Sequence, residues 1–166
     1  MYATITRQDV DKAYKNIKAI IDGMLNLNKI DFHVCPDAPS TYKAMRKAYE
    51  DSIELNGKGF FTVYGGGDHG LLGREYNIRF RALHDSMHYK HNLSFSFDDE
   101  KRLSDITKKE FMLHAYRILG LTQWETFVIG QVIDREIRGQ IEYYELNKTY
   151  VNDQTKFILG ELLEVC

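Results

Sequence analysis

Three of the six histidines of the chain lie within eight residues, at positions 84, 88 and 91. If this stretch is helical, His84, His88 and His91 share one face, because residues three, four and seven apart lie on the same side of a helix. Two imidazoles one turn apart can reach a single metal ion. The spacing therefore predicts a metal site at His84 and His88, with His91 as an alternate ligand.

The same stretch carries the other charged groups that a metal-dependent reaction needs. Asp85 lies next to the first histidine, where it would act as a general base or orient an imidazole. Arg81 shares the histidine face and would bind an anionic substrate group or a developing negative charge. We therefore expect Asp85 and Arg81 to be catalytic, and Arg79 to contact the substrate.

A third ligand is expected from a long helix predicted over 123–146. Helical spacing puts Glu136 and Gln140, one turn apart, at the centre of its apolar face. A buried carboxylate is costly unless it is paired or bound to a cation. Glu136 should therefore meet either the ion held by the histidines or an arginine such as Arg81. Two histidines and one carboxylate suit zinc, manganese or iron, so the divalent metal stays open.

A glycine-rich loop, 65–73, joins the strand-like segment 59–64 to the histidine helix. Strand, glycine-rich loop and helix in this order can place backbone amides around an anion. The spacing matches neither the P-loop nor the dinucleotide fingerprint, so a simple turn is favoured. The loop could nevertheless fold back over the helix. The residues expected to contact the substrate are then Asp68, His69, Gln140 and Tyr143, besides Arg79.

The remaining elements must hold these two helices together. Periodicity and capping patterns predict helices at 8–27, 40–55, 76–91, 98–103, 108–119 and 123–146, with a last one from about 152. Strands are predicted at 30–35 and 59–64, with 93–97 or 2–6 as further pairing partners. The expected fold is α+β and mostly α. Five or six helices would pack around the 76–91 and 123–146 helices, with a small minor sheet, in one domain over 1–166.

The composition is typical of a soluble globular protein, with 43% hydrophobic and 28% charged residues. The net charge of −2 argues against a nucleic-acid-binding protein. Two cysteines without a metal-type spacing fit a reducing compartment. No apolar run has the length of a membrane span and no signal peptide is recognised, so a cytoplasmic protein without a membrane partner is expected.

Two short motifs resemble known metal sites. The segment His84-Asp-Ser-Met-His88 resembles the zincin motif H-E-x-x-H, with Asp85 in place of the glutamate that serves that family as general base. The His84-Asp85 pair also resembles the signature of HD phosphohydrolases. That resemblance implies a divalent metal, an earlier histidine and a later aspartate. His69 or His33 would supply the histidine, and Asp134 the aspartate.

A longer series of segments also carries a resemblance. It comprises 80–88 with the pattern F-R-x-x-H-D-x-x-H, then 95–100, then 139–144 with G-Q-x-x-Y-Y, and 152–154. In this order the segments resemble a family of uncharacterised bacteriophage and prophage proteins. The resemblance implies a phage origin, location in the host cytoplasm, and helices 79–91 and 131–146 within one unit.

Two functions of different classes are consistent with these patterns. The first is a metal-dependent enzyme, which we expect to be a hydrolase acting on a small or anionic substrate. The alternative is a phage protein that binds and inhibits a host factor without chemistry of its own. In that case the cluster of histidine, arginine, glutamate and glutamine side chains would be a buried polar network that joins two helices.

Overall fold

The computed structural model describes residues 4–67 and 69–163, which are mostly helical with a small two-stranded sheet, as predicted. The elements in chain order are α1 (Arg7–Leu27), β1 (Phe32–Val34), α2 (Tyr42–Asn56), β2 (Phe61–Val63), α3 (Gly73–His91), α4 (Phe97–Arg117), α5 (Gln123–Asp134), the π-helix η1 (Arg135–Gly139), α6 (Gln140–Asn147) and α7 (Gln154–Leu163). The segments α5, η1 and α6 follow one another without a break, so we call them the α5–α6 rod.

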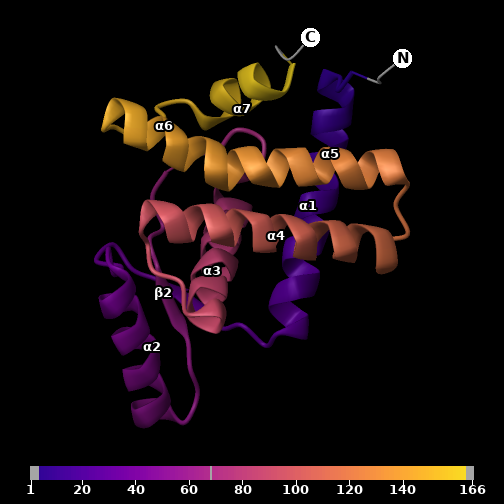
Figure 1. Ribbon diagram of the computed structural model, residues 1–166. Coiled ribbons are helices and arrows are strands. Elements are labelled where there is room, and N and C mark those ends of the chain that lie inside the picture. Colours follow the sequence, from indigo (N-terminus) through magenta and orange to yellow (C-terminus); the bar gives the residue numbers. More distant parts are fainter. Residues whose placement is uncertain (1–3, 68, 164–166) are drawn as a thin grey trace.

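The core lies between two pairs of helices. Helices α4 and α5 run antiparallel and side by side, and both cross α1 (Figure 1). Each of these three helices contributes one apolar stripe to the core, as expected for helices that bury one face. The buried residues of α1 include Val10, Ile17, Ile20 and Ile21, and those of α5 include Ile129, Val132 and Ile133. Helix α3 packs against α1 on the same side of the α4–α5 pair, and α7 contacts the rod at η1.

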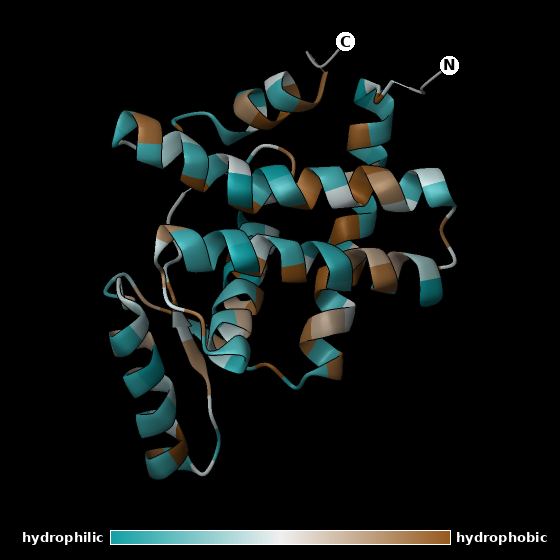
Figure 2. Ribbon diagram, viewed as in Figure 1, coloured by the Kyte–Doolittle hydropathy of each residue, from teal (hydrophilic) through white to brown (hydrophobic). Residues whose placement is uncertain are grey.

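The two strands form a parallel pair, with Phe32 opposite Phe61 and Val34 opposite Val63. Helix α2 connects them and packs on β2, whose other contacts are with α3. Figure 2 shows a largely hydrophobic β2 beside a mostly hydrophilic α2. The sheet is therefore stabilised by the helices on it, because two strands alone are marginal.

The further strand pairing expected for this sheet is absent from the described residues. Residues 4–6 and 93–96 are not in a strand, whereas residues 2 and 3 lie outside the described part of the chain. The backbone at 94–96 turns instead, because Ser94 and Ser96 bond to Asp99 at the start of α4.

Helix α4 is longer than predicted, since the expected helices 98–103 and 108–119 are one continuous element. Thr107 and Glu110 have the spacing of a capping box, which favours a helix start there, but the structure does not use it. Thr107 is buried in the middle of α4, and Glu110 binds Lys90 of α3 at 3.3 Å. The same spacing recurs at Thr122 and Glu125, and there both hydrogen bonds of a capping box form at the start of α5.

The polar side of the α5–α6 rod is covered by α4 rather than by solvent. Helical counting places Asp134 on the polar face of its helix, where solvent exposure is expected, yet it is buried and lies 3.2 Å from Arg138. Arg138 in turn binds Asp105 of α4 at 2.5 Å. These ion pairs compensate the charges between α4 and the α5–α6 rod. Asp134 therefore pairs with an arginine and not with the histidines.

Candidate metal centre

His84 and His88 of α3 meet Glu100 of α4 at one point. His84 Nε2 lies 3.1 Å from His88 Nε2 and 3.3 Å from Glu100 Oε2, while His88 Nε2 lies 3.2 Å from Glu100 Oε1. Three atoms of the kinds that bind metals thus converge, one from each side chain. The structure brings the two histidines together as their spacing predicts.

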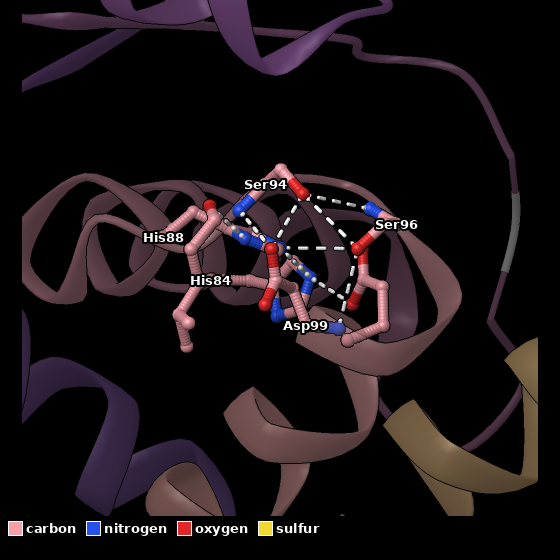
Figure 3. A network of polar contacts seen from close by, with 7 residues as sticks. His84, His88, Ser94, Ser96 and Asp99 are labelled. Atoms are coloured by element: carbon pink, nitrogen blue, oxygen red, sulfur yellow. Dashed lines mark hydrogen bonds and ion pairs between the residues drawn. The ribbon is translucent and has the colours of Figure 1, made fainter.

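The short connection between α3 and α4 places Glu100 at this point. Asn92 ends α3 in the left-handed conformation, and Ser96 caps α4 by accepting a hydrogen bond from Asp99 N. The Asp99 carboxylate in turn accepts hydrogen bonds from Ser94 N at 2.9 Å and from Ser94 Oγ at 2.5 Å. Figure 3 shows this turn beside the two imidazoles. The first turn of α4, which carries Glu100, is therefore held against the last turns of α3.

The backbone also orients His88, whose side chain is fully buried. Its Nδ1 lies 3.0 Å from the carbonyl oxygen of Leu93. A carbonyl only accepts, so Nδ1 carries the proton and Nε2 presents its lone pair to His84 and Glu100. Metal-ligating histidines are commonly oriented in this way, with the other ring nitrogen donating to a carbonyl.

The pKa values in this group shift in the directions expected for a site that needs a cation. Burial would raise the pKa of Glu100, but His84 and His88 hold it well below its usual range. Burial opposes a charge on His84, yet Glu100 raises its pKa overall. Burial, together with His84, lowers the pKa of His88. A buried carboxylate facing two imidazoles requires a positive charge between them, either a proton or a metal ion.

Glu136 is also buried, as predicted, but it has other partners. Its Oε1 accepts hydrogen bonds from Tyr14 Oη and from His69 Nε2 at 2.8 Å, and its Oε2 accepts one from Gln140 Nε2 at 3.0 Å. His69 Nδ1 accepts a hydrogen bond from Leu72 N at 3.0 Å, so Nε2 carries the proton. Three donors therefore compensate this carboxylate. The expectation that Glu136 completes the metal set is corrected, since Glu100 takes that place.

The π-helix η1 contains Glu136, and π-helical turns are frequent at functional sites. Gln140 follows directly, and its Oε1 accepts a hydrogen bond from Gln154 Nε2 at 3.0 Å. The Tyr14, His69, Glu136, Gln140 and Gln154 side chains thus form one hydrogen-bonded chain, which we call the Glu136 network.

A cavity of about 180 Å³ separates the candidate metal centre from the Glu136 network. Its polar lining consists of Asn77, Arg81, His84, Glu100, Glu136, Gln140 and Gln154, and its apolar walls include Phe80, Ile137 and Ile141. A small pocket with apolar walls and a few convergent polar groups is the usual form of a ligand site. The open side of the metal centre faces this pocket, because both His84 and Glu100 line it.

The two arginines predicted for the site differ in their surroundings. Arg81 lines the cavity, and its Nη1 donates to the carbonyl oxygens of Tyr64 at 2.8 Å and Gly66 at 2.5 Å. Arg79 instead binds Asp22 and Glu75, each at 2.9 Å. Arg79 is not among the described residues that line the cavity.

Other predicted residues also lie away from the cavity. Asp85 is not among its described lining residues, and burial raises its pKa to about 6, with Glu100 raising it and His84 and Arg81 opposing. His91 Nε2 lies 3.8 Å from Glu110 rather than at the metal centre. Tyr143 packs edge-on against Phe157. His69 contacts Glu136 behind the cavity wall, and Asp68 lies outside the described residues.

Three polar residues of the cavity lining, Asn77, Glu100 and Gln154, were not predicted as site residues from the sequence. Asn77 lies four and seven residues before Arg81 and His84, so helical counting alone places all three on one face. Glu100 follows the histidine helix after a very short connection, and such connections bring the ends of neighbouring helices together. Its segment is also one of those that carry the phage resemblance.

Comparison of the chain with protein-family models, with curated proteins and with solved structures finds no match. Within residues 4–67 and 69–163, no helix has the length and apolar character needed to cross a membrane. A function for the chain therefore has to be inferred from the geometry of the site.

Proposed function

We propose that the chain is a metal-dependent enzyme in which His84, His88 and Glu100 hold one divalent ion. The supporting observation is the closeness of the three side chains: the two imidazole Nε2 atoms are 3.1 Å apart, and each lies 3.2–3.3 Å from one of the two Glu100 carboxylate oxygens. Zinc binds histidine and carboxylate ligands at about 2.0–2.1 Å, so two ligands of a tetrahedral ion lie about 3.3 Å apart. The side chains already have nearly this separation, and a cation between them would compensate the buried carboxylate.

The site supports catalysis rather than a purely structural ion. Structural zinc sites are closed by four protein ligands, whereas catalytic sites have three and keep a position for water or substrate. Among the described residues, only these three side chains form such a group. The remaining coordination positions would face the cavity that His84 and Glu100 line.

The reaction class that we favour is hydrolysis of a small substrate. A bound zinc ion lowers the pKa of its water to about 7 and so supplies a nucleophile at neutral pH. Arg81 would stabilise negative charge that develops in the same cavity. Manganese and iron remain within the proposal, because two histidines and one carboxylate also form non-haem iron sites. A phage origin and the host cytoplasm belong to the proposal through the sequence resemblance alone.

Metal analysis of protein purified without a histidine tag tests the centre directly. We expect one equivalent of metal per chain in the wild type and its loss in His84→Ala and Glu100→Gln. The matched control is Glu136→Gln, which alters the other buried carboxylate of the cavity and should keep the metal. Activity on simple phosphate and carboxylate esters should depend on the metal and disappear in Glu100→Gln.

A contrary outcome is equally well defined. If the wild type holds no metal after reconstitution, and chelator changes neither its stability nor its spectra, a proton on His84 compensates Glu100. The cluster would then be a buried polar network, and the alternative of a protein that binds a host factor would replace the enzyme.

A further inference from the structure

The cavity has a second recognition element, on the part of α3 that precedes the metal ligands. We infer that Asn77 and Arg81 form an anion subsite that holds the carboxylate or phosphate group of the substrate beside the metal. This inference rests on the proposed metal centre for its functional meaning. Its evidence is the geometry of the two side chains.

Asn77 is the first observation. It is only 6% exposed, it lines the cavity, and its Nδ2 has no hydrogen-bond partner among the described residues. Buried polar atoms are nearly always hydrogen-bonded, so an unpaired amide group aimed into a cavity requires an explanation. A ligand atom that accepts a hydrogen bond would satisfy it.

Arg81 is the second observation, because the glycine-rich loop fixes its guanidinium group. Nη1 donates to the carbonyls of Tyr64 and Gly66, whereas no described carboxylate forms an ion pair with the group. A Cβ atom placed on Gly67 would lie 3.1 Å from Arg81 Nη2 and 3.9 Å from Asn77 Nδ2. Both donors therefore lie close to a single point beside the loop, which is the arrangement that an anionic oxygen pair requires.

The charges around the cavity also favour an anion. The Glu136 carboxylate accepts three hydrogen bonds from the Glu136 network, and Glu100 would be bound to the metal. A divalent ion and Arg81 together carry more positive charge than the two lining carboxylates carry negative charge, so the lining of the metal-loaded cavity is net positive. Because Asn77, Arg81 and His84 follow one another along one face of α3, an anionic group held by the first two would lie next to the metal.

Calorimetry with inorganic phosphate and with acetate tests this subsite. The wild type is first loaded with zinc and freed of excess metal, and Asn77→Leu, Arg81→Gln and Arg74→Gln are treated identically. The Leu variant is close in size to Asn and removes a donor that has no protein partner, so it should fold as well as the wild type. Arg74→Gln is the control, because Arg74 is an exposed arginine of the same helix.

We expect one equivalent of phosphate or acetate to bind the wild type and Arg74→Gln. Binding should weaken at least tenfold in Asn77→Leu and Arg81→Gln, while each variant keeps its metal. Tighter phosphate binding would identify a phosphoryl substrate, and tighter acetate binding a carboxylate. Metal-loaded wild type that binds neither anion, or variants that bind as the wild type does, would overturn the subsite.

The same experiment distinguishes an error in the proposed metal centre from an error in the anion subsite. If the protein takes up no zinc, the proposed enzyme is wrong. Anion binding to the metal-free chain that still requires Asn77 and Arg81 would nevertheless support the subsite.

Discussion

At the scale of single residues, the buried carboxylate of Glu136 and the partly buried carboxylate of Glu100 face the same cavity but are compensated in different ways. Glu136 is surrounded by groups that donate hydrogen bonds, from Tyr14, His69 and Gln140. Glu100 instead faces His84 and His88, of which His88 presents a lone pair. A carboxylate whose neighbours all donate is compensated by them, whereas Glu100, which faces the lone pair of His88, needs a positive charge from a proton on His84 or from a metal ion.

Removal of the Glu136 carboxylate should therefore affect stability. We expect Glu136→Ala to lower the free energy of unfolding by about 3 kcal/mol, because it leaves buried donors without a partner. Chemical denaturation measures this loss, and Glu54→Ala at an exposed site of α2 is the control, expected within about 0.5 kcal/mol of the wild type. Equal stability of the two variants would show that the Glu136 network does not hold the fold.

At the scale of elements, the glycine-rich loop has a different use from the one that its composition suggests. The carbonyl oxygens of Gly66 and of Tyr64, which directly precedes the loop, accept hydrogen bonds from the Arg81 side chain. Gly65 leaves no room for a side chain, since a Cβ there would lie 2.2 Å from Val34. Gly67 has a φ of +83°, which disfavours other residues. The loop positions an arginine, and through it one wall of the cavity.

Two glycine-to-alanine substitutions should have opposite effects on the stability of the protein. Gly67→Ala is expected to destabilise the protein by about 1 kcal/mol, because of its positive φ and its closeness to Arg81. Gly160→Ala lies within α7 with no atom close to the new methyl group, and it should stabilise the protein by about 0.5–1 kcal/mol. Thermal unfolding of both variants gives the sign directly, and a Gly67→Ala variant as stable as the wild type would contradict the account of the loop.

At the scale of the whole molecule, charged contacts between helices add to the apolar core that holds the frame of the site. Lys12 of α1 lies 2.6 Å from Glu125 of α5, which also forms the capping box with Thr122. The hydrogen bond from Lys12 is the main cause that lowers the pKa of Glu125 to about 2, from an ordinary value of 4.5. Because the folded state lowers this pKa, its contribution to stability is present above pH 4.5 and is lost as the pH falls towards 2.

Acid titration of stability tests this link. Glu125→Gln should show a smaller loss of unfolding free energy than the wild type between pH 4.5 and 2. The difference should be about 1 kcal/mol at most, because Lys12 is largely exposed and water screens the pair. Glu54→Gln serves as the control, and identical slopes for wild type and Glu125→Gln would exclude the link.

A bound metal should also stabilise the folded state of the whole molecule. Its ligands join α3 to α4, so zinc at one hundred times its dissociation constant should add about 2.7 kcal/mol to the stability of the folded state. For a chain of this length that corresponds to a rise in Tm of roughly 5–10 °C. Scanning calorimetry should show the rise in the wild type and in Glu136→Gln, and no rise in Glu100→Gln. A rise of equal size in all three would mean that zinc binds elsewhere.

The sequence by itself determined the features that depend on local spacing. Helical periodicity predicted most of the helices, the shared face of His84 and His88, and the burial of Glu136. It failed where a choice depended on contacts between distant segments. The expected break between residues 103 and 108 did not occur, and Asp134 was covered by α4.

Only the tertiary structure decided which carboxylate meets the histidines. Spacing along one helix shows which side chains point inward, and Glu136 is buried while Glu100 is partly buried. Their partners depend on how α3, α4 and the α5–α6 rod pack against one another. The short turn at Ser94 and Ser96 brings Glu100 to the imidazoles, while Tyr14 and His69 compensate Glu136 from α1 and the glycine-rich loop.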